Sequence, residues 1–132
     1  MIVRSVQDII NTDRDVRGDV WASRRLLLAK DGAGLGFSLN ETIVEAGAQL
    51  DLWYKHHIEA NYIVEGEGTV EDVVTGKVYP LKPGTTYTVG KHDRHIVRAT
   101  TRMKLLCVFS PPLTGRETHD ADGSYMPRPQ KS

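Results

Sequence analysis

The amino-acid sequence predicts one all-β domain, an antiparallel sandwich or jelly-roll barrel with a single short helix near the N-terminus. Twelve glycines and six prolines divide the 132 residues into short segments. Turn signals such as Asp31-Gly32, Glu65-Gly66 and Pro83-Gly84 separate these segments at the close spacing typical of many short strands. The length suits one hydrophobic core, so we expect a single domain.

The first predicted element is a helix over residues 5–11. Ser5 is a suitable N-cap, Asp8 lies at the capping-box offset, and Ile9 and Ile10 supply an apolar side. Strands are expected for the rest of the domain. In chain order they cover residues 20–28, 35–44, 48–54, 58–64, 69–74, 77–81, 85–89, 95–100 and 103–109.

The character of the sequence changes after the proline pair Pro111-Pro112. The following residues are polar and contain no strand-like run. We expect residues 1–124 to form the domain, with 113–124 as an ordered loop or lid over it. We expect residues 125–132 to be a flexible tail.

Two of the predicted strands leave open which of their faces is buried. Ser38, Asn40 and Thr42 alternate with apolar residues, and Trp21 and Arg25 share one face of an earlier strand. The ordinary interpretation turns a polar row toward solvent. The alternative is that the polar row lines a wet cavity inside a barrel.

Composition narrows the classes of function. Lysine plus arginine equals aspartate plus glutamate at 17 each, so the net charge is zero. General binders of nucleic acid or anionic membranes need a basic excess, and we expect neither partner. The single cysteine, Cys107, excludes an internal disulfide. The N-terminal residues lack the apolar stretch of a signal peptide and no run reaches the roughly 18 residues of a membrane span, so we expect a cytoplasmic protein.

The densest group of polar residues runs from Tyr54 to Glu59. On a strand, His57 and Glu59 lie on the same face because side chains alternate with a period of two. This arrangement suits metal binding, although an isolated pair of this kind is more often an ordinary surface pair. Cys107 shares a face with Phe109, which is compatible with simple packing or with a position near a site.

The spacing around this group resembles that of the cupin motifs. The first motif matches at Gly47, Trp53, Lys55, Glu59 and Gly66, and the second at Gly84, Gly90, His92, His95 and Ala99. Of the usual ligand positions, Glu59 and His95 keep a ligand, whereas tryptophan and lysine are not normal metal ligands. Either the metal site is lost or a third ligand comes from elsewhere. The alternation of side chains along a strand makes Tyr87, on the strand that leads to His95, a candidate.

The whole chain, from Met1 to about Tyr125, resembles the ectoine synthase family of cupins. The matching strings include residues 53–60, 65–68, 91–95 and 111–115. The resemblance implies a metal held by Glu59, Tyr87 and His95, usually iron(II), and this donor set also accommodates manganese or zinc. It further implies a homodimer that converts N-γ-acetyl-L-2,4-diaminobutyrate into the compatible solute ectoine by ring closure with loss of water.

The resemblance also implies a set of residues around the substrate. They are Trp21, Arg25, Thr42, Tyr54, Phe109, Glu117 and His119. Arg25 suits a carboxylate clamp because its planar fork binds two oxygens at once. We expect Tyr54, His57, Glu117 and His119 to take part in catalysis. Tyr54 and Glu59 have opposite strand parity, so both face one cavity only if a bulge or twist lies between them.

Two other classes of function are compatible with a cupin barrel. A non-catalytic cupin would bind a small molecule without proton-transfer groups, and Arg25, Glu117 and His119 argue against it. An iron-dependent oxygenase would prefer two histidines and a carboxylate, and the first motif here lacks both of its histidines.

Overall fold

The structure, a computed structural model, describes residues 1–32 and 34–115. It contains helix α1 (Val6–Ile9) and a 3-10 helix, η1 (Ala29–Asp31). The strands are β1 (Asp15–Arg17), β2 (Trp21–Leu27), β3 (Ser38–Val44), β4 (Gln49–Leu52), β5 (Ile58–Glu65), β6 (Gly68–Asp72), β7 (Val78–Leu81), β8 (Thr86–Val89), β9 (His95–Ala99) and β10 (Met103–Ser110). The all-β prediction is confirmed. Within the described residues, no helix is long and apolar enough to cross a membrane.

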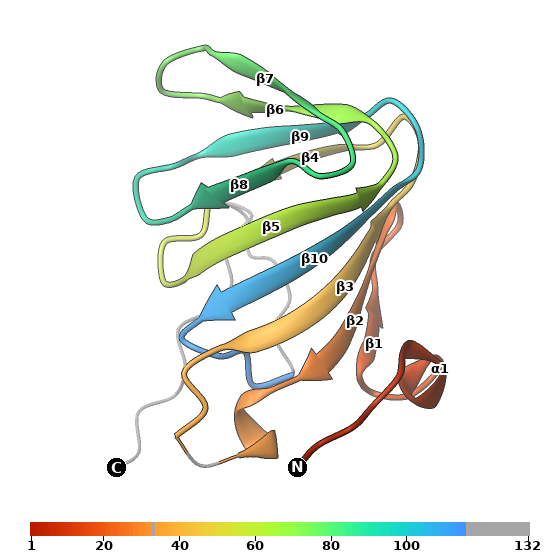
Figure 1. Cartoon of the computed structure of the whole chain (residues 1–132). Coiled ribbons are helices and arrows are strands. Elements are labelled where there is room, and N and C mark those ends of the chain that lie inside the picture. The colour runs from red at the N-terminus through yellow and green to blue at the C-terminus, as the bar shows by residue number, and fades with distance from the viewer. Residues whose placement is uncertain (33, 116–132) are drawn as a thin grey trace.

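The strands form two antiparallel sheets that enclose one core (Figure 1). The larger sheet has the order β1-β2-β3-β10-β5-β8, and the smaller has the order β4-β9-β6-β7. In the larger sheet the last strand of the described residues, β10, lies between β3 and β5. Buried residues of both sheets, including Val97, Leu105 and Phe109, join in a single hydrophobic cluster.

Helix α1 is shorter than predicted but begins as expected. The backbone N–H of Ser5 donates to Asp8 Oδ2 at 2.8 Å, which is half of a capping box. The helix ends at Ile9, and Asn11 adopts a left-handed conformation with φ of 64°, which does not continue a helix. The helix packs on β2, where Ala22 is buried on the outer face of the larger sheet.

Strand β1 was not predicted from the sequence. It has three residues, two of them charged, and therefore no apolar pattern to reveal it. It pairs with β2, with Asp15 opposite Arg24. The turn between them requires Gly18, because a Cβ there would lie 2.3 Å from the Nε1 atom of Trp21. The indole of Trp21, at the start of β2, therefore packs directly against the backbone of Gly18.

Asp31 ties the N-terminal segment to η1. Its carboxylate accepts hydrogen bonds from Arg4 Nη1 at 3.1 Å, from Arg14 Nη1 at 3.0 Å and from the Leu28 backbone N–H at 2.8 Å. The side chain is only 7% exposed. The hydrogen bonds from Arg14, with help from Leu28 and Arg4, hold the pKa of Asp31 well below its usual range.

We therefore expect Asp31→Asn to destabilise the protein by about 2 kcal/mol at pH 7, since charged hydrogen bonds to a buried acceptor are lost. A carboxylate with a lowered pKa in the folded state stabilises the fold above its unfolded pKa of 3.8 and loses this effect as the pH falls. The difference between variant and wild type should thus shrink below about pH 4. Urea unfolding at several pH values measures this difference in the free energy of unfolding. The control is Asp51→Asn, which removes an exposed ion pair with Arg94. Equal stability of the Asp31 variant and wild type at pH 7 would contradict this prediction.

The polar face of β3 points into the molecule, so the outward interpretation of that row is wrong. The exposed fractions of Ser38 and Asn40 are 0% and 1%. Ser38 Oγ accepts a hydrogen bond from the backbone N–H of Leu113 at 2.9 Å. The neighbouring strand behaves alike, with Ser23 and Arg25 both buried. The inner face of the larger sheet therefore carries buried polar side chains among its apolar ones, as in a barrel that holds a ligand.

Candidate active site

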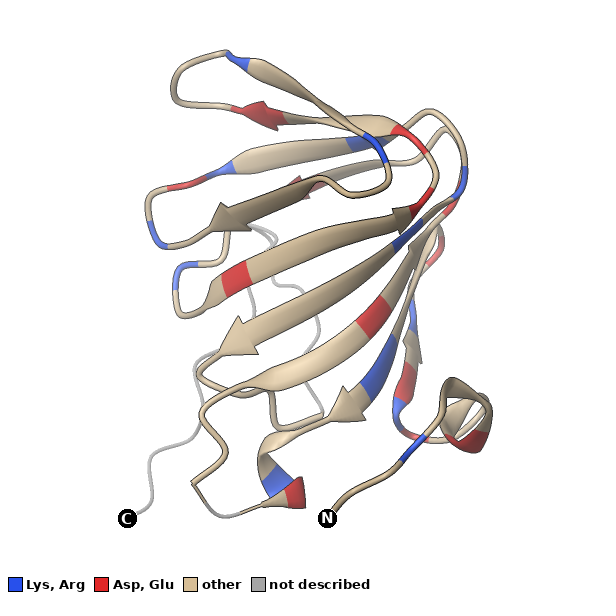
Figure 2. Cartoon of the chain, viewed as in Figure 1, with Lys and Arg blue, Asp and Glu red and all other residues tan. Residues whose placement is uncertain are grey.

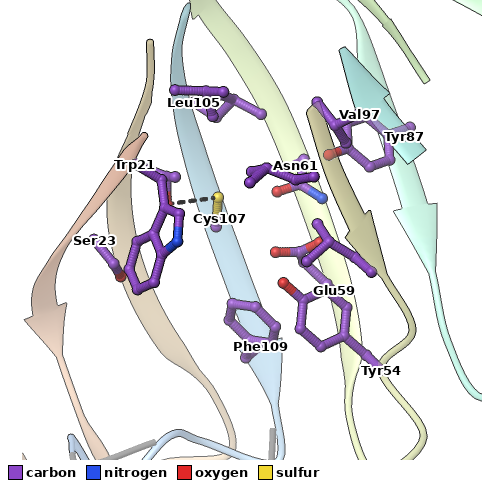
Figure 3. Close-up of a pocket in the computed structure, with 14 residues that line it drawn as sticks. Trp21, Ser23, Tyr54, Glu59, Asn61, Tyr87, Val97, Leu105, Cys107 and Phe109 are labelled. Atoms are coloured by element: carbon purple, nitrogen blue, oxygen red, sulfur yellow. Dashed lines mark hydrogen bonds between the residues drawn. The ribbon is translucent and has the colours of Figure 1, made fainter. Parts of the chain in front are cut away.

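A cavity between the two sheets is walled by residues of seven strands and of the loop after β4 (Figure 3). Its lining is mixed, with aromatic and aliphatic walls and a few polar groups, as is usual in small-molecule sites. The lining residues are Trp21, Ser23, Thr42, Val44, Leu50, Leu52, Tyr54, Glu59, Asn61, Tyr87, Val97, Leu105, Cys107 and Phe109.

A transverse polar row crosses the inner face of the larger sheet. The strand registers pair Arg25 with Asn40, Asn40 with Cys107, Cys107 with Asn61, and Asn61 with Tyr87. Facing residues on adjacent strands lie close enough for their side chains to interact. Four of the five are buried to 3% exposure or less, so this row brings polar groups together away from solvent.

Glu59, Tyr87 and His95 meet around this region. Glu59 and Tyr87 line the cavity, and Tyr87 also borders a second cavity that His95 lines. The rings of Tyr87 and His95 are 6.2 Å apart. His95 Nδ1 lies 2.8 Å from the carbonyl oxygen of Asp93. Because a carbonyl only accepts, Nδ1 carries the proton, and the buried Nε2 is left with a lone pair and no hydrogen-bond partner.

The electrostatics of these residues fit a divalent cation. Burial raises the pKa of Glu59 to about 7, although the nearby Asn61 amide lowers it, and burial raises the pKa of Tyr87 well above its usual value. Burial also lowers the pKa of His95, which keeps its imidazole neutral. A bound cation would favour the anionic forms that burial alone disfavours. The residues present therefore fit a metal with one nitrogen and two oxygen donors.

A third donor near Glu59 and His95 would have to be of another residue type. In residues 1–32 and 34–115, no three histidine, cysteine, aspartate or glutamate side chains form a metal-binding group. The predicted ligand Tyr87, which lies across the sheet from Asn61, offers a phenol oxygen in this region.

Tyr54 reaches the cavity from the connection between β4 and β5. Its ring is 5.9 Å from the ring of His95 and 5.2 Å from that of Phe109. Strand β4 ends at Leu52 and β5 begins at Ile58, so the alternation of one strand does not extend to the other. Tyr54 and Glu59 face the same cavity because the chain turns between them, and no bulge within a strand is needed.

The other predicted site residues are distributed around the cavity. Trp21, Thr42 and Phe109 line it. His57 is buried with its ring 6.0 Å from Phe109, and Arg25 is fully buried in the transverse polar row, but neither is part of the cavity lining. The predicted Glu117 and His119 lie outside the described residues.

Comparison with known proteins identifies one family. The family model for ectoine synthase matches residues 1–129. An L-ectoine synthase from Desulfosudis oleivorans is 56% identical over 126 residues, which is 95% of this chain and 96% of the relative. The crystal structure of ectoine synthase from P. lautus has a TM-score of 0.85 and 46% identity, covering 99% of this chain and 94% of that chain. The chain belongs to the ectoine synthase family.

The wider cupin fold is also supported. An RmlC-like cupin from Shewanella frigidimarina NCIMB 400 matches with a TM-score of 0.60 at 24% identity, over 74% of this chain and 81% of that chain. At this identity the likeness concerns the fold alone. The predicted cupin barrel of this ectoine synthase family member is thereby confirmed.

Sequence reasoning missed several polar residues of this ectoine synthase family cavity. Ser23 shares a strand face with Trp21, and Asn61 lies two residues after Glu59, so strand alternation already pointed to both. Cys107, for which the sequence left open either simple packing or a position near a site, lines the cavity, and its Sγ donates to Thr42 Oγ1 at 3.3 Å. Burial raises the pKa of Cys107 well above its usual value, so the thiol stays protonated.

Proposed function

We propose that the protein converts N-γ-acetyl-L-2,4-diaminobutyrate into ectoine, with Glu59, Tyr87 and His95 holding the divalent metal that the reaction uses. The chain is a hydro-lyase of the ectoine synthase family. The observation that carries the proposal is a cavity lined by Glu59 and Tyr87, with the ring of Tyr87 6.2 Å from that of His95, whose buried Nε2 has no partner. Three protein ligands leave coordination positions for a substrate, which is the arrangement of catalytic sites.

The acetamide carbonyl of the substrate is a poor electrophile, so the reaction requires a group that polarises it. A bound metal, which we propose to be iron(II), would supply Lewis acidity at the acetamide carbonyl, and manganese or zinc would fit the same donors. The protein itself would hold the three donor side chains in place. His95 is oriented by its bond to the Asp93 carbonyl, which fixes both the tautomer and the ring.

The linear substrate must be curled so that its α-amine meets its own acetamide carbon. Such positioning contributes several kcal/mol to catalysis, about 7–11 kcal/mol in the best intramolecular models. Trp21 and Phe109 provide the aromatic walls against which the carbon chain would fold. Thr42 offers a hydroxyl on the same wall. Arg25 is our candidate to balance the charge of the substrate carboxylate, because its buried guanidinium lies in the adjoining polar row.

Protons must leave the amine and reach the departing oxygen. We propose Tyr54, His57, Glu117 and His119 as the groups that move them. Tyr54 borders the cavity, and His57 is buried with its ring 6.0 Å from that of Phe109, which lines the cavity. Positioned acids and bases of this kind typically accelerate a reaction by about 10²–10⁴-fold.

An anaerobic assay tests the proposal. Protein stripped of metal and reloaded with iron(II) is mixed with the acetylated diamine without oxygen, and ring closure is followed by NMR. We expect turnover with iron(II) and none in the stripped protein. A non-catalytic binding cupin would give no product under either condition. An oxygenase would give product only when oxygen is admitted, so each outcome separates one class from the others.

We further propose that the protein works in the cytoplasm as a homodimer on a small molecule. Lys and Arg are interspersed with Asp and Glu along the ribbon of the described chain (Figure 2), and the net charge is zero, which does not favour a polyanion as a partner. Tyr62 and Leu106 are paired across β5 and β10 on the outer face, where they are 48% and 37% exposed. A second copy of the chain would cover such an apolar face.

A further inference from the structure

Asn61 occupies a central position in the cavity wall. Its cross-strand neighbours are Tyr87 on β8 and Cys107 on β10, and it follows Glu59 by one step of strand alternation. The side chains of all four residues line the same cavity, and Figure 3 shows Asn61 between Cys107 and Tyr87, with Glu59 next to it along the strand. Asn61 is therefore the polar residue that borders two of the proposed metal ligands directly.

The amide of Asn61 has donor capacity to spare. Asn61 is 2% exposed, and its Nδ2 atom makes no hydrogen bond of ordinary length and angle, although the amide lies near enough to Glu59 to lower the pKa of that carboxyl. Because Nδ2 carries two N–H groups, one stays available to a ligand when the other faces Glu59. The backbone carbonyl of Asn61 is satisfied by Thr86 Oγ1 at 2.7 Å, so only the side chain is left over. A buried donor without a partner costs about 1–3 kcal/mol. Nothing in the packing of β5 requires an amide here, since leucine has nearly the same shape.

A ligand in the cavity can provide a further acceptor for Nδ2. In the proposed reaction the acetamide oxygen of the substrate would face Glu59 and Tyr87, and Asn61 neighbours both of these residues. As the α-amine lone pair forms the new C–N bond, the π pair of the carbonyl moves onto this oxygen. The amine then gives up two protons, the oxygen takes up two, and the C–O bond breaks to release water. Negative charge grows on the oxygen only during the reaction.

We propose that Asn61 is a catalytic residue whose Nδ2–H donates to the acetamide oxygen as charge develops on it. The inference rests on the proposed function and adds a group to it. An amide that is already oriented stabilises the developing charge without reorganising, and donors of this kind act mainly on kcat. Ser23 Oγ and Asn40 Oδ1 also lack partners, but neither residue neighbours Glu59 or Tyr87 in the sheet.

The test compares Asn61→Leu and Asn61→Ala with wild type in the anaerobic NMR assay of the full-length, iron-loaded protein. Thr86→Val is the matched control, because it removes the hydrogen bond to the Asn61 carbonyl from outside the cavity. We expect Asn61→Leu to lower kcat by about 100- to 1,000-fold, by analogy with other donors to a developing oxyanion. KM, iron content and melting temperature should stay close to wild type, and the control should turn over normally.

Several results would overturn the proposal. An unchanged kcat would show that Nδ2 does not serve the reaction. A rise in KM alone would show a contact made equally in the ground state, and a loss of iron would show that Asn61 only supports Glu59. Asn61→Ala keeps the test open if the leucine variant does not fold. A wild type without turnover would instead refute the proposed function, so the two failures are distinguishable.

Discussion

Tyr87→Phe should lose its metal and its ring-closing activity while remaining folded. The change removes one oxygen from a set of three donors and keeps the aromatic ring that packs near His95. Since even supporting residues around a metal are worth about 10–100-fold in affinity, a direct ligand should cost at least 100-fold. Elemental analysis after gel filtration, together with the NMR assay, measures both losses.

Tyr62→Phe is the matched control for this experiment. Tyr62 lies on the neighbouring strand β5 but on its outer face, where it is 48% exposed. The control loses the same phenol oxygen away from the cavity and should keep wild-type iron content. Wild-type iron in Tyr87→Phe would mean that the third ligand is another residue.

Removal of residues 116–132 should leave a folded, metal-binding protein that turns over about 10²–10⁴-fold more slowly, because Glu117 and His119 are then absent. The cut is best made after Gly115. Leu113 is fully buried, and its backbone N–H and carbonyl bond to Ser38 Oγ and to the Ala29 N–H, so residues 113–115 belong to the packed part of the chain. The proposed ligands all precede the cut. Circular dichroism checks that the shortened protein folds, elemental analysis measures its iron content, and the NMR assay measures its turnover.

A second truncation isolates the residues responsible. A protein that ends at Ser124 loses only the predicted tail, 125–132, and keeps Glu117 and His119. It should turn over like wild type. Full activity in the shorter protein that ends at Gly115 would refute a catalytic role for the segment that carries those two residues.

The sequence was sufficient to locate most strands because turn residues mark where each strand ends. It was not sufficient for β1, whose three residues are held by pairing with β2 and by ion pairs rather than by apolar burial. Alternation in β3 correctly separated two faces, but it could not say which face was interior. That choice depends on tertiary packing that a single strand does not encode: helix α1 packs on β2, and Ala22 of β2 and its partner Ile43 of β3 are buried on the outer face.

The site shows the same division between local and tertiary information. The spacing of the motifs predicts Glu59 and His95 as ligands. For Tyr87, only the alternation of side chains along its strand pointed to the site, until the family resemblance added support. The place of Tyr54 could not be derived, because the turn at residues 53–57 resets the alternation between β4 and β5. Asn61 was overlooked because a single asparagine in a strand has no distinctive pattern. Its neighbours Tyr87 and Cys107 become visible only once the strand register is known.

The central place of β10 in the larger sheet has a consequence for biosynthesis. Strands β3 and β5 cannot be joined until β10 has been made, since it pairs with both. A nascent chain that stops before residue 103 would therefore expose two unpaired strand edges, which are prone to aggregate. The cavity wall formed by Leu105, Cys107 and Phe109 would also be missing from it. Such long-range pairing folds slowly, so the binding cavity forms only after almost the whole domain has left the ribosome.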